Sequence, residues 1–324
     1  MVDEKNNFFF FNVCATIIWI DTGEMKMKNV LVFDFGGTSI KYSEFVDGKL
    51  GVVDSFPTPA TWDEMKEKLM SIKEKYETNV AFDGATFSFP GCVDNIKGEI
   101  VGSPAIKYII NFPIKKELEL LLGMPVSMEN DANCAALAEC WMGAAKDVPH
   151  VLFVVVGTGV GGGIIVDGKL HAGAHLYGGE FGFMILEEDE AGTPLTLSKA
   201  GTAVQMAFRY CERKGVPHGT FSGKEVFELA DAGDVDAQAV VEHFYANLSK
   251  GLVNLQLSFD PEMIVIGGGL SANATIIEEL NRRVNEWIER FGLKDFTAKV
   301  VACEYKNDAN LYGAIRNFDV EHDL

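Results

Sequence analysis

The sequence predicts an α/β protein with two halves and a cleft between them. Its 324 residues suit two domains at about 150 residues each. An apolar strand, a glycine turn and a second strand open the chain at Val30, and the same pattern is repeated from Val151. Because strand and helix patterns follow both openings, each half is expected to be α/β.

The first half is expected to hold strands at 30–34, 40–46, 49–56 and 80–87 and a helix at 62–76. Asp47-Gly48 predicts a hairpin turn between the second and third of these strands. Thr61 and Glu64 have the spacing of a capping box. Apolar residues then recur at steps of three and four, which is typical of an amphipathic helix.

The rest of the chain is expected to hold strands at 125–128, 151–156, 164–166 and 263–266 and helices at 132–145, 237–259 and 275–291. Asp131 is expected to cap the alanine-rich helix that follows it. Further glycine turns are expected at 157–163 and 267–269. The second half is therefore expected to repeat the strand, glycine turn and strand that open the first half.

The composition excludes several classes of partner. Lys and Arg number 28 against 47 Asp and Glu, and the formal net charge of −19 opposes binding to nucleic acid or to an anionic membrane. The six cysteines are widely spaced and form no zinc-binding pattern with histidine. We therefore expect reduced thiols, a cytoplasmic location and no zinc.

Residues 1–27 are expected to lie outside the fold. Phe8 to Ile20 is an apolar run of 13 residues, whereas crossing a bilayer takes about 20. Asp3 and Glu4 precede the run and Asp21-Thr22-Gly23-Glu24 follows it, without the basic n-region and small-residue cleavage site of a signal peptide. We expect a disordered extension or a start codon assigned too early, with translation beginning at Met25 or Met27. An extra strand or a frayed arm is the alternative.

Two glycine turns between antiparallel strands are candidates for binding phosphate. Gly157 to Gly162 fits the dinucleotide fingerprint in letters and residues 163–169 resemble a P-loop, but no helix follows either. Backbone N–H groups in glycine turns can face phosphate oxygens, so turns at 36–38 and 157–159 would clamp a nucleoside triphosphate. Asp34, at the lip of the first turn, would hold a hydrated Mg²⁺. The alternative is an aspartate that only bonds its own turn.

Asp131 is the candidate general base. It lies where an expected strand meets a helix, so helix-terminal amides favour its ionised form and it can accept a proton from a substrate hydroxyl. Asn130 beside it and Glu180 in a later glycine-rich loop are candidates for binding the hydroxyls of a polyol. The alternatives are a plain helix cap for Asp131 and a solvated loop residue for Glu180.

Taken together, these motifs resemble the sugar kinases of the ROK family. The matching segments run in family order at 34–38, 88–91, 129–133, 157–163, 179–182, 267–269 and 311–314. The resemblance implies a two-domain actin-like ATPase fold of the ribonuclease H-like type, with an interdomain cleft. It also implies a smaller domain of residues 28–131 plus 308–324, a larger domain of residues 132–307, and a homodimer.

The resemblance further implies ATP- and Mg²⁺-dependent transfer of the γ-phosphoryl group to a sugar hydroxyl, usually at C6. Asp131 would be the catalytic base, and Asp34 would serve the magnesium ion through water. The sugar site is expected to include Asn130, Asp131, Glu180, Pro90, Gly91 and Phe183. The nucleotide site is expected to include Gly36, Gly37, Thr38, Lys41, Gly157, Thr158, Gly159, Gly268 and Gly269.

One departure from the family bears on the substrate. Many members continue Gly-Glu-x-Gly with a histidine and a cysteine-rich zinc loop, but Phe183 stands in the histidine position and residues 184–198 contain neither Cys nor His. An apolar Phe183 can pack against an aglycone or a second sugar, so we expect a kinase of β-glucosides such as cellobiose. N-acetylmannosamine kinase and glucokinase are the rivals within the family.

Two readings from other functional classes remain. A non-catalytic sugar-sensing regulator would keep the fold and bind sugar without turnover. A DNA-binding repressor is disfavoured, because only 29 residues precede Val30 and they are not basic.

Overall fold

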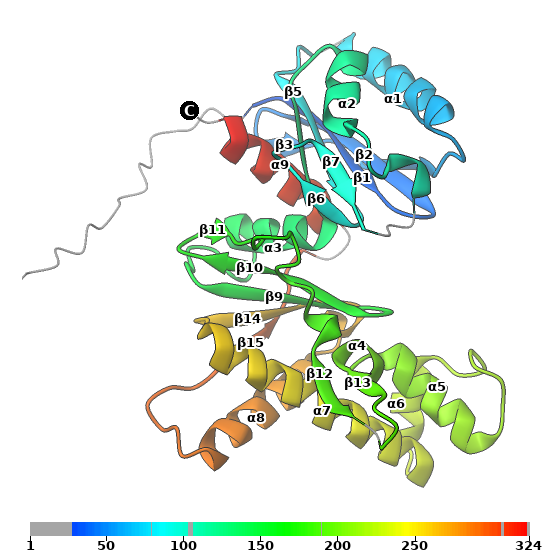
Figure 1. The fold of residues 1–324 in the computed structure, drawn as a ribbon, viewed down its shortest axis with the longest axis vertical. Coiled ribbons are helices and arrows are strands. Elements are labelled where there is room, and N and C mark those ends of the chain that lie inside the picture. Colours follow the sequence, from blue (N-terminus) through cyan, green and yellow to red (C-terminus); the bar gives the residue numbers. More distant parts are fainter. Residues whose placement is uncertain (1–27, 79, 103–105, 189, 306–307, 323–324) are drawn as a thin grey trace, which may run out of the picture.

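The computed structural model describes residues 28–78, 80–102, 106–188, 190–305 and 308–322. Within this part of the chain, two sheets lie one above the other along the long axis, each with helices on its faces (Figure 1). The expected N-terminal extension at residues 1–27 lies outside the described residues. Among the described helices, none is both long enough and apolar enough to cross a membrane.

The first sheet has the strand order β3-β2-β1-β5-β8, with β4 paired to β2. Its strands are β1 (Val30–Phe35), β2 (Ser39–Val46), β3 (Lys49–Leu50), β4 (Asp54–Pro57), β5 (Gly84–Phe89) and β8 (Val126–Asn130). β1 is antiparallel to β2 and parallel to β5, which is parallel to β8.

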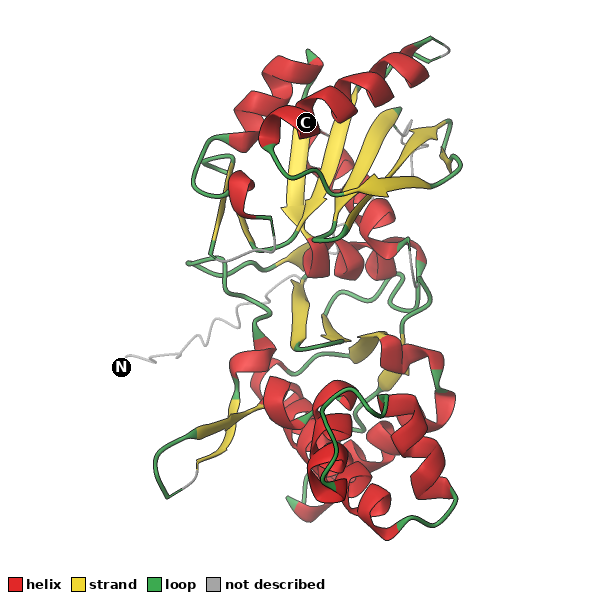
Figure 2. Cartoon of the chain, turned by 90° about the vertical axis from the view of Figure 1, so that its right-hand side faces the viewer, coloured by secondary structure: helices red, strands yellow, loops and turns green. Residues whose placement is uncertain are grey.

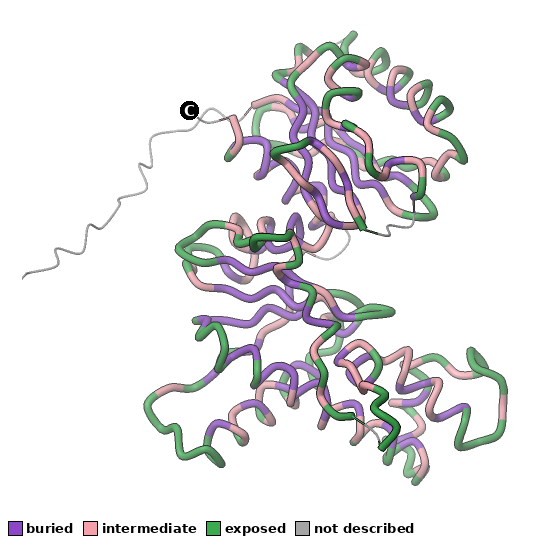
Figure 3. The backbone as a smooth tube through the Cα atoms, viewed as in Figure 1, coloured by how far each residue is buried: buried purple, intermediate pink, exposed green. Residues whose placement is uncertain are grey.

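Side chains alternate between the two faces of β1, as strand geometry requires. Leu31 and Phe33 join the core formed with α1 (Trp62–Glu77) and α2 (Ile114–Leu122). Val30 and Val32 face the opposite way and pack with α9 (Ala309–His322). The sheet is therefore covered on both faces, and Figure 3 shows its strands as largely buried.

The second sheet has the order β11-β10-β9-β14-β15. Its strands are β9 (Val151–Val156), β10 (Val160–Val166), β11 (Lys169–Leu170), β14 (Met263–Gly268) and β15 (Val300–Ala302). Leu152 and Val154 pack with α7 (Val235–Phe259) and α8 (Ala274–Arg290). Val151 and Phe153 face the other way and pack with residues of α3 (Asp131–Met142).

Smaller elements complete both halves. Helices α4 (Leu197–Ala200), α5 (Ala203–Lys214) and α6 (Gly223–Asp231) lie beside α7. The hairpin of β12 (Ile185–Glu188) and β13 (Pro194–Thr196) projects from this half in Figure 2. The hairpin of β6 (Cys92–Asp94) and β7 (Glu99–Val101) follows β5, and 3₁₀ turns occupy Lys107–Ile109, Phe181–Phe183 and Gly269–Ala272.

Helices α3 and α9 cross between the two sheets (Figure 1). α3 packs on β9 and β10 of the second sheet, whereas α9 packs on β1, β5 and β8 of the first. Gly313 permits the close crossing, because a Cβ there would overlap the carbonyl oxygen of Cys134. Since α3 starts at Asp131, the candidate base lies at the junction of the two halves.

Most of the expected elements are confirmed, but several bounds were wrong. The expected strand at 49–56 is interrupted between β3 and β4, and the strand expected at 80–87 runs from Gly84 to Phe89. β10 begins at Val160 rather than at residue 164, because the three glycines at 161–163 continue the ladder with β9 instead of turning. The glycine turn is accordingly shorter than expected.

Two helix ends also differ from expectation. The Oγ1 of Thr61 accepts a hydrogen bond from the N–H of Glu64 at 3.3 Å, but the Glu64 carboxylate bonds Ala60 rather than Thr61, so the capping box is half formed. The helix expected at 132–145 ends at Met142. Local spacing thus identified the four expected helices without fixing every end, and α2, α4, α5, α6 and α9 were not predicted.

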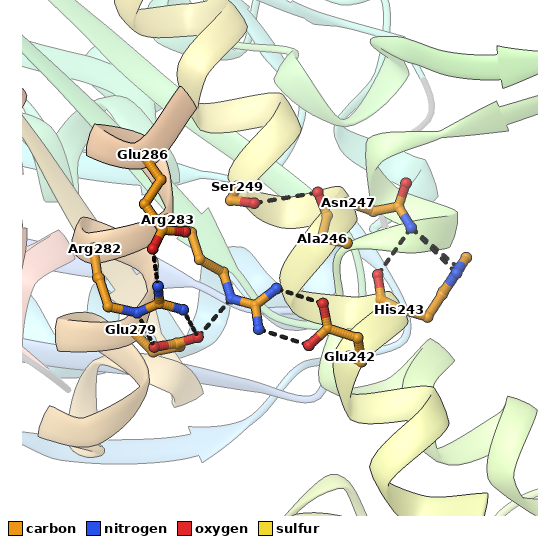
Figure 4. Close-up of polar contacts among 9 residues, drawn as sticks. All are labelled: Glu242, His243, Ala246, Asn247, Ser249, Glu279, Arg282, Arg283 and Glu286. Carbon is orange, nitrogen blue, oxygen red and sulfur yellow. Dashed lines mark hydrogen bonds and ion pairs between the residues drawn. The ribbon is translucent and has the colours of Figure 1, made fainter. Parts of the chain in front are cut away.

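An ion-pair network joins α7 to α8 (Figure 4). Arg283 on α8 donates two hydrogen bonds to the carboxylate of Glu242 on α7, at 2.7 and 2.6 Å. It also donates to Glu279 of its own helix at 2.6 Å. Arg282 pairs within α8, with Glu279 and Glu286.

Replacing Arg283 with methionine is expected to lower the free energy of unfolding by about 1 kcal/mol at low salt, because a bidentate pair between two helices is lost. The loss should shrink at high salt, where surface charges are screened. Arg282→Met is the matched control and should cost clearly less. Equal losses for the two variants in urea unfolding would mean that the contact between the helices contributes nothing.

Candidate active site

A cavity of about 200 Å³ lies where the start of α3 meets β10 and the loop before η2 (Phe181–Phe183). Four of the expected sugar-site residues line it: Gly91, Asn130, Asp131 and Glu180. Pro90 and Phe183 are not in its lining, and the Phe183 side chain is 71% exposed. The cavity therefore gathers residues from both halves of the chain, but not all of those expected.

Asp131 lies at the first helical position of α3, on the wall of the cavity. Its Oδ1 accepts hydrogen bonds from the N–H of Ala132 at 2.8 Å and from the Nδ2 of Asn130 at 3.0 Å. Its Oδ2 accepts no side-chain or backbone bond from the rest of the described chain. One carboxylate oxygen is thus held in place while the other is open to a substrate hydroxyl.

Burial raises the pKa of Asp131 to about 6. The nearby charge of Asp34 contributes to this rise, and the hydrogen bonds from Ala132 and Asn130 oppose it, so the pKa of about 6 is the net result. A carboxylate with a pKa near 6 is ionised at neutral pH and is a stronger base than an ordinary aspartate. The electrostatics therefore suit proton acceptance.

Asn130, not Asp131, caps α3, which corrects the sequence expectation. The Oδ1 of Asn130 accepts from the N–H of Asn133 at 3.1 Å. Its Nδ2 donates to the carbonyl of Gly91 at 2.9 Å and to Asp131. Both of its amide hydrogens are therefore committed, and the residue orients Asp131 as well as lining the cavity.

Glu129 is a buried carboxylate behind the candidate base that sequence reasoning missed. It accepts hydrogen bonds from the backbone N–H of Asn130 at 2.7 Å, from Asn133 at 3.0 Å and from Asn95 at 3.1 Å. Burial raises the pKa of Glu129 despite these bonds. Its position in the acidic run before α3 was visible in the sequence, but its partner on the loop after β6 was not.

Asp34 is buried at the end of β1, beside the parallel strand β5. Its Oδ1 accepts from the hydroxyl of Ser88 at 2.9 Å and from Asn310 of α9 at 3.1 Å. Burial raises the pKa of Asp34, while Lys41 across the β1–β2 pair lowers it. Both of these hydrogen bonds end on Oδ1, so within the described residues Oδ2 is the oxygen available to a cation or to its water.

No group of three or more metal-binding side chains occurs within the described ranges. A lone carboxylate still fits Mg²⁺, which keeps several waters and is commonly held by one or two carboxylates together with substrate phosphates. Asp34 therefore suits a Mg²⁺ site completed by water and substrate phosphates, and not a site in which the protein supplies every ligand.

A second cavity, of about 420 Å³, shares Val155 with the first. Lys41, Gly268 and Gly269 line it, as expected for a nucleotide site, and Asn310 lies beside them. The turns at 36–38 and 157–159 are outside its lining and lie largely exposed at the ends of their hairpins. The structure thus places three of the nine expected nucleotide residues in one cavity.

Glu139 anchors the far end of α3, and the sequence analysis did not single it out. Its fully buried carboxylate accepts from the backbone N–H groups of Ala144, Glu304 and Tyr305, at 2.9, 3.1 and 2.7 Å. Tyr305 lines the second cavity. Helix α3 therefore contributes to both cavities: Asp131 lines the first and Ala135 lines the second, while Glu139 holds the loop that carries Tyr305.

Comparison with known proteins identifies the family. The ROK family sequence model matches residues 30–318. The chain belongs to the ROK family. A beta-glucoside kinase of Listeria monocytogenes is 35% identical over 292 residues, which are 89% of this chain and 97% of the relative.

Solved structures of ROK proteins share the fold. A ROK family protein of Streptococcus pneumoniae in complex with sucrose has a TM-score of 0.82 and 32% identity, over 91% of this chain and 99% of the other. A Listeria monocytogenes protein proposed to be an N-acetylmannosamine kinase has a TM-score of 0.80 and 34% identity, over 90% of this chain and 99% of the other. The expected actin-like ATPase fold is therefore confirmed.

Proposed function

We propose that this ROK protein uses ATP and Mg²⁺ to phosphorylate the C6 hydroxyl of β-glucosides such as cellobiose. The observation that carries the proposal is Asp131, whose Oδ2 is open on the wall of a cavity adjoining a second, glycine-lined cavity. The chain is a sugar kinase of its family, and ATP is the donor that this family uses. The sugar, the metal ion and the residue roles are our proposal.

Asp131 accepts the proton of the sugar hydroxyl as the hydroxyl oxygen forms its bond to the γ-phosphorus. The bond from that phosphorus to the β-phosphate oxygen breaks, and ADP leaves with the electron pair. Asn130 keeps the Asp131 carboxylate in its orientation, and Glu180 binds sugar hydroxyls at the mouth of the cavity. The proton on Asp131 then passes to solvent.

Bound Mg²⁺ would neutralise the developing charge on the phosphates. Asp34 would hold this ion through water. Hydrogen bonds from Ser88 and Asn310 fix the orientation of the Asp34 carboxylate. Lys41 and the backbone of Gly268 and Gly269 would contact the phosphates from the walls of the second cavity. We further propose that the glycine turns at 36–38 and 157–159 close over the nucleotide.

The substrate assignment rests on the missing zinc-loop residues and on the β-glucoside kinases among the relatives. N-acetylmannosamine is the second candidate, because the Listeria structure proposed to act on it covers 90% of this chain. We also propose a cytoplasmic homodimer without zinc, with domains at 28–131 plus 308–324 and at 132–307. Sedimentation equilibrium tests the dimer.

The test is ADP release from ATP and Mg²⁺ with purified protein and four sugars: cellobiose, methyl β-glucoside, glucose and N-acetylmannosamine. We expect kcat/KM for the two glucosides to exceed that for glucose, and all turnover to require Mg²⁺. Turnover of glucose or N-acetylmannosamine alone would replace the substrate but keep the kinase. Sugar binding without any ADP release would identify a sensor.

A further inference from the structure

Leu176 adopts a backbone conformation that leucine rarely takes. Its φ is +64°, in the left-handed region that disfavours residues with a branched side chain. Five other described non-glycine residues have positive φ, and all are Asp or Asn, which tolerate this region: Asp47, Asn111, Asp147, Asp167 and Asp260. Leu176 therefore stands apart, and such strain persists only where surrounding structure imposes it.

The loop that carries Leu176 is braced against β10. Gly179, with φ of +94°, lies so close to Gly162 that a Cβ there would overlap the carbonyl oxygen of Gly162. The N–H of Gly178 donates to the carbonyl of Ala172 at 2.9 Å and closes the loop upon itself. Gly173 also has positive φ, at +77°. The glycines on either side thus fix the loop, and Leu176 takes the conformation that remains.

This conformation places Leu176 in the lining of the sugar cavity. Its lining includes the polar side chains of Asn130, Asp131 and Glu180 and also apolar side chains, among them Leu176 and Val93. Val93 comes from β6 in the first half of the chain, whereas Leu176 comes from the second half. Apolar side chains from both halves therefore line a site whose substrate carries many hydroxyls.

A free hexose has hydroxyls all round its ring, and burying one against leucine would leave it without a hydrogen bond. A β-glucoside replaces the anomeric hydroxyl with an ether oxygen and adds an aglycone, or the apolar face of a second sugar. Burying the apolar surface of such a substituent against leucine would strengthen binding, whereas free glucose has no apolar substituent to place against Leu176.

We propose that Leu176 is a specificity-determining residue that contacts the aglycone of a β-glucoside. The inference rests on the proposed function, and it assigns to Leu176 the role that the sequence alone suggested for Phe183. Phe183 is 71% exposed and lies outside the cavity lining, so its ring is poorly placed for that contact.

The experiment compares Leu176→Gly with Phe183→Ala, using a phenyl β-glucoside, cellobiose and glucose as substrates. Glycine is suited to positive φ, so Leu176→Gly should fold at least as well as the wild type, as thermal unfolding will check. We expect Leu176→Gly to lower kcat/KM for the phenyl glucoside about tenfold, while glucose changes by less than about twofold. Asp167→Gly, at a left-handed position in a hairpin turn outside the cavity, is the matched control.

Several outcomes would overturn the inference. An unchanged preference in Leu176→Gly would do so, as would an equal loss for glucose and glucosides, or a change of preference produced by Phe183→Ala alone. Calorimetric binding of the same sugars separates this inference from the proposed function. If the wild type turned over no sugar, the kinase assignment would fail, and affinity for the phenyl glucoside in Leu176→Gly would still decide whether Leu176 contacts the aglycone.

Discussion

The Asp131→Asn variant is expected to lose about 10³-fold in kcat, because asparagine cannot accept the proton of the sugar hydroxyl. Its side-chain oxygen can still accept from the N–H of Ala132, as Oδ1 of Asp131 does at 2.8 Å, so the start of α3 should be preserved. ADP release under saturating sugar and ATP measures the loss. Sugar affinity within a few-fold of wild type would confirm that chemistry rather than binding was removed.

The same variant is expected to be more stable than the wild type at pH 8. The pKa of Asp131 rises from 3.8 to about 6 in the folded protein, so the fold favours the protonated carboxyl. The contribution of the protonated Asp131 carboxyl to the stability of the fold is complete below pH 3.8 and is lost as the pH rises through 6. Asparagine does not titrate, and the gain in free energy of unfolding at pH 8 should be about 3 kcal/mol.

The pH dependence tests the same assignment. Because Asp131 must be ionised to act as a base, kcat/KM for the sugar should fall about tenfold per pH unit below pH 6 and be level above it. A profile that stays level down to pH 4.5, or an Asp131→Asn variant that keeps more than about a tenth of wild-type kcat, would remove Asp131 from the base role.

The sequence located the parts of the site that depend on local pattern. Asp131 follows a strand and opens a helix within one short run, and both features can be read from neighbouring residues. Gly91 and Glu180 lie in motifs that carry the family resemblance, and both line the cavity with Asp131.

The parts that the sequence did not reveal depend on contacts between distant residues. Glu129 and Glu139 are acidic residues in or next to a helix, a pattern that usually indicates a solvated surface. Their burial depends on donors far along the chain, such as Asn95 for Glu129 and Tyr305 for Glu139. The left-handed conformation of Leu176 was not predicted either, because leucine rarely adopts positive φ and the close approach of Gly179 to Gly162 of β10 is a contact between separate elements.

Substitution of Glu139 is expected to affect both the stability of the fold and the binding of the nucleotide. Its two carboxylate oxygens accept three backbone N–H groups, from Ala144, Glu304 and Tyr305, and its side chain is fully buried. Each buried donor left without a partner costs about 1–3 kcal/mol. Glu139→Ala is therefore expected to lower the free energy of unfolding by about 4 kcal/mol, measured by urea unfolding.

Glu139→Gln separates the packing of the side chain from its role as an acceptor. Glutamine keeps the shape but has one oxygen in place of two, so about half of the loss is expected. Glu289→Ala, at an exposed position on α8, is the matched control and should change stability by less than about 0.5 kcal/mol. A loss in Glu139→Ala no greater than that of the control would show that water replaces the carboxylate.

The same contacts predict which substrate the Glu139 variants should lose. Tyr305 and its neighbour Cys303 line the second cavity and not the first, so loosening this loop disturbs the proposed nucleotide site while leaving Asp131 and Asn130 in place. Glu139→Gln should therefore raise KM for ATP several-fold and leave KM for the sugar near its wild-type value. Equal increases in both KM values would instead mean that α3 itself has shifted, because residues of that helix line both cavities.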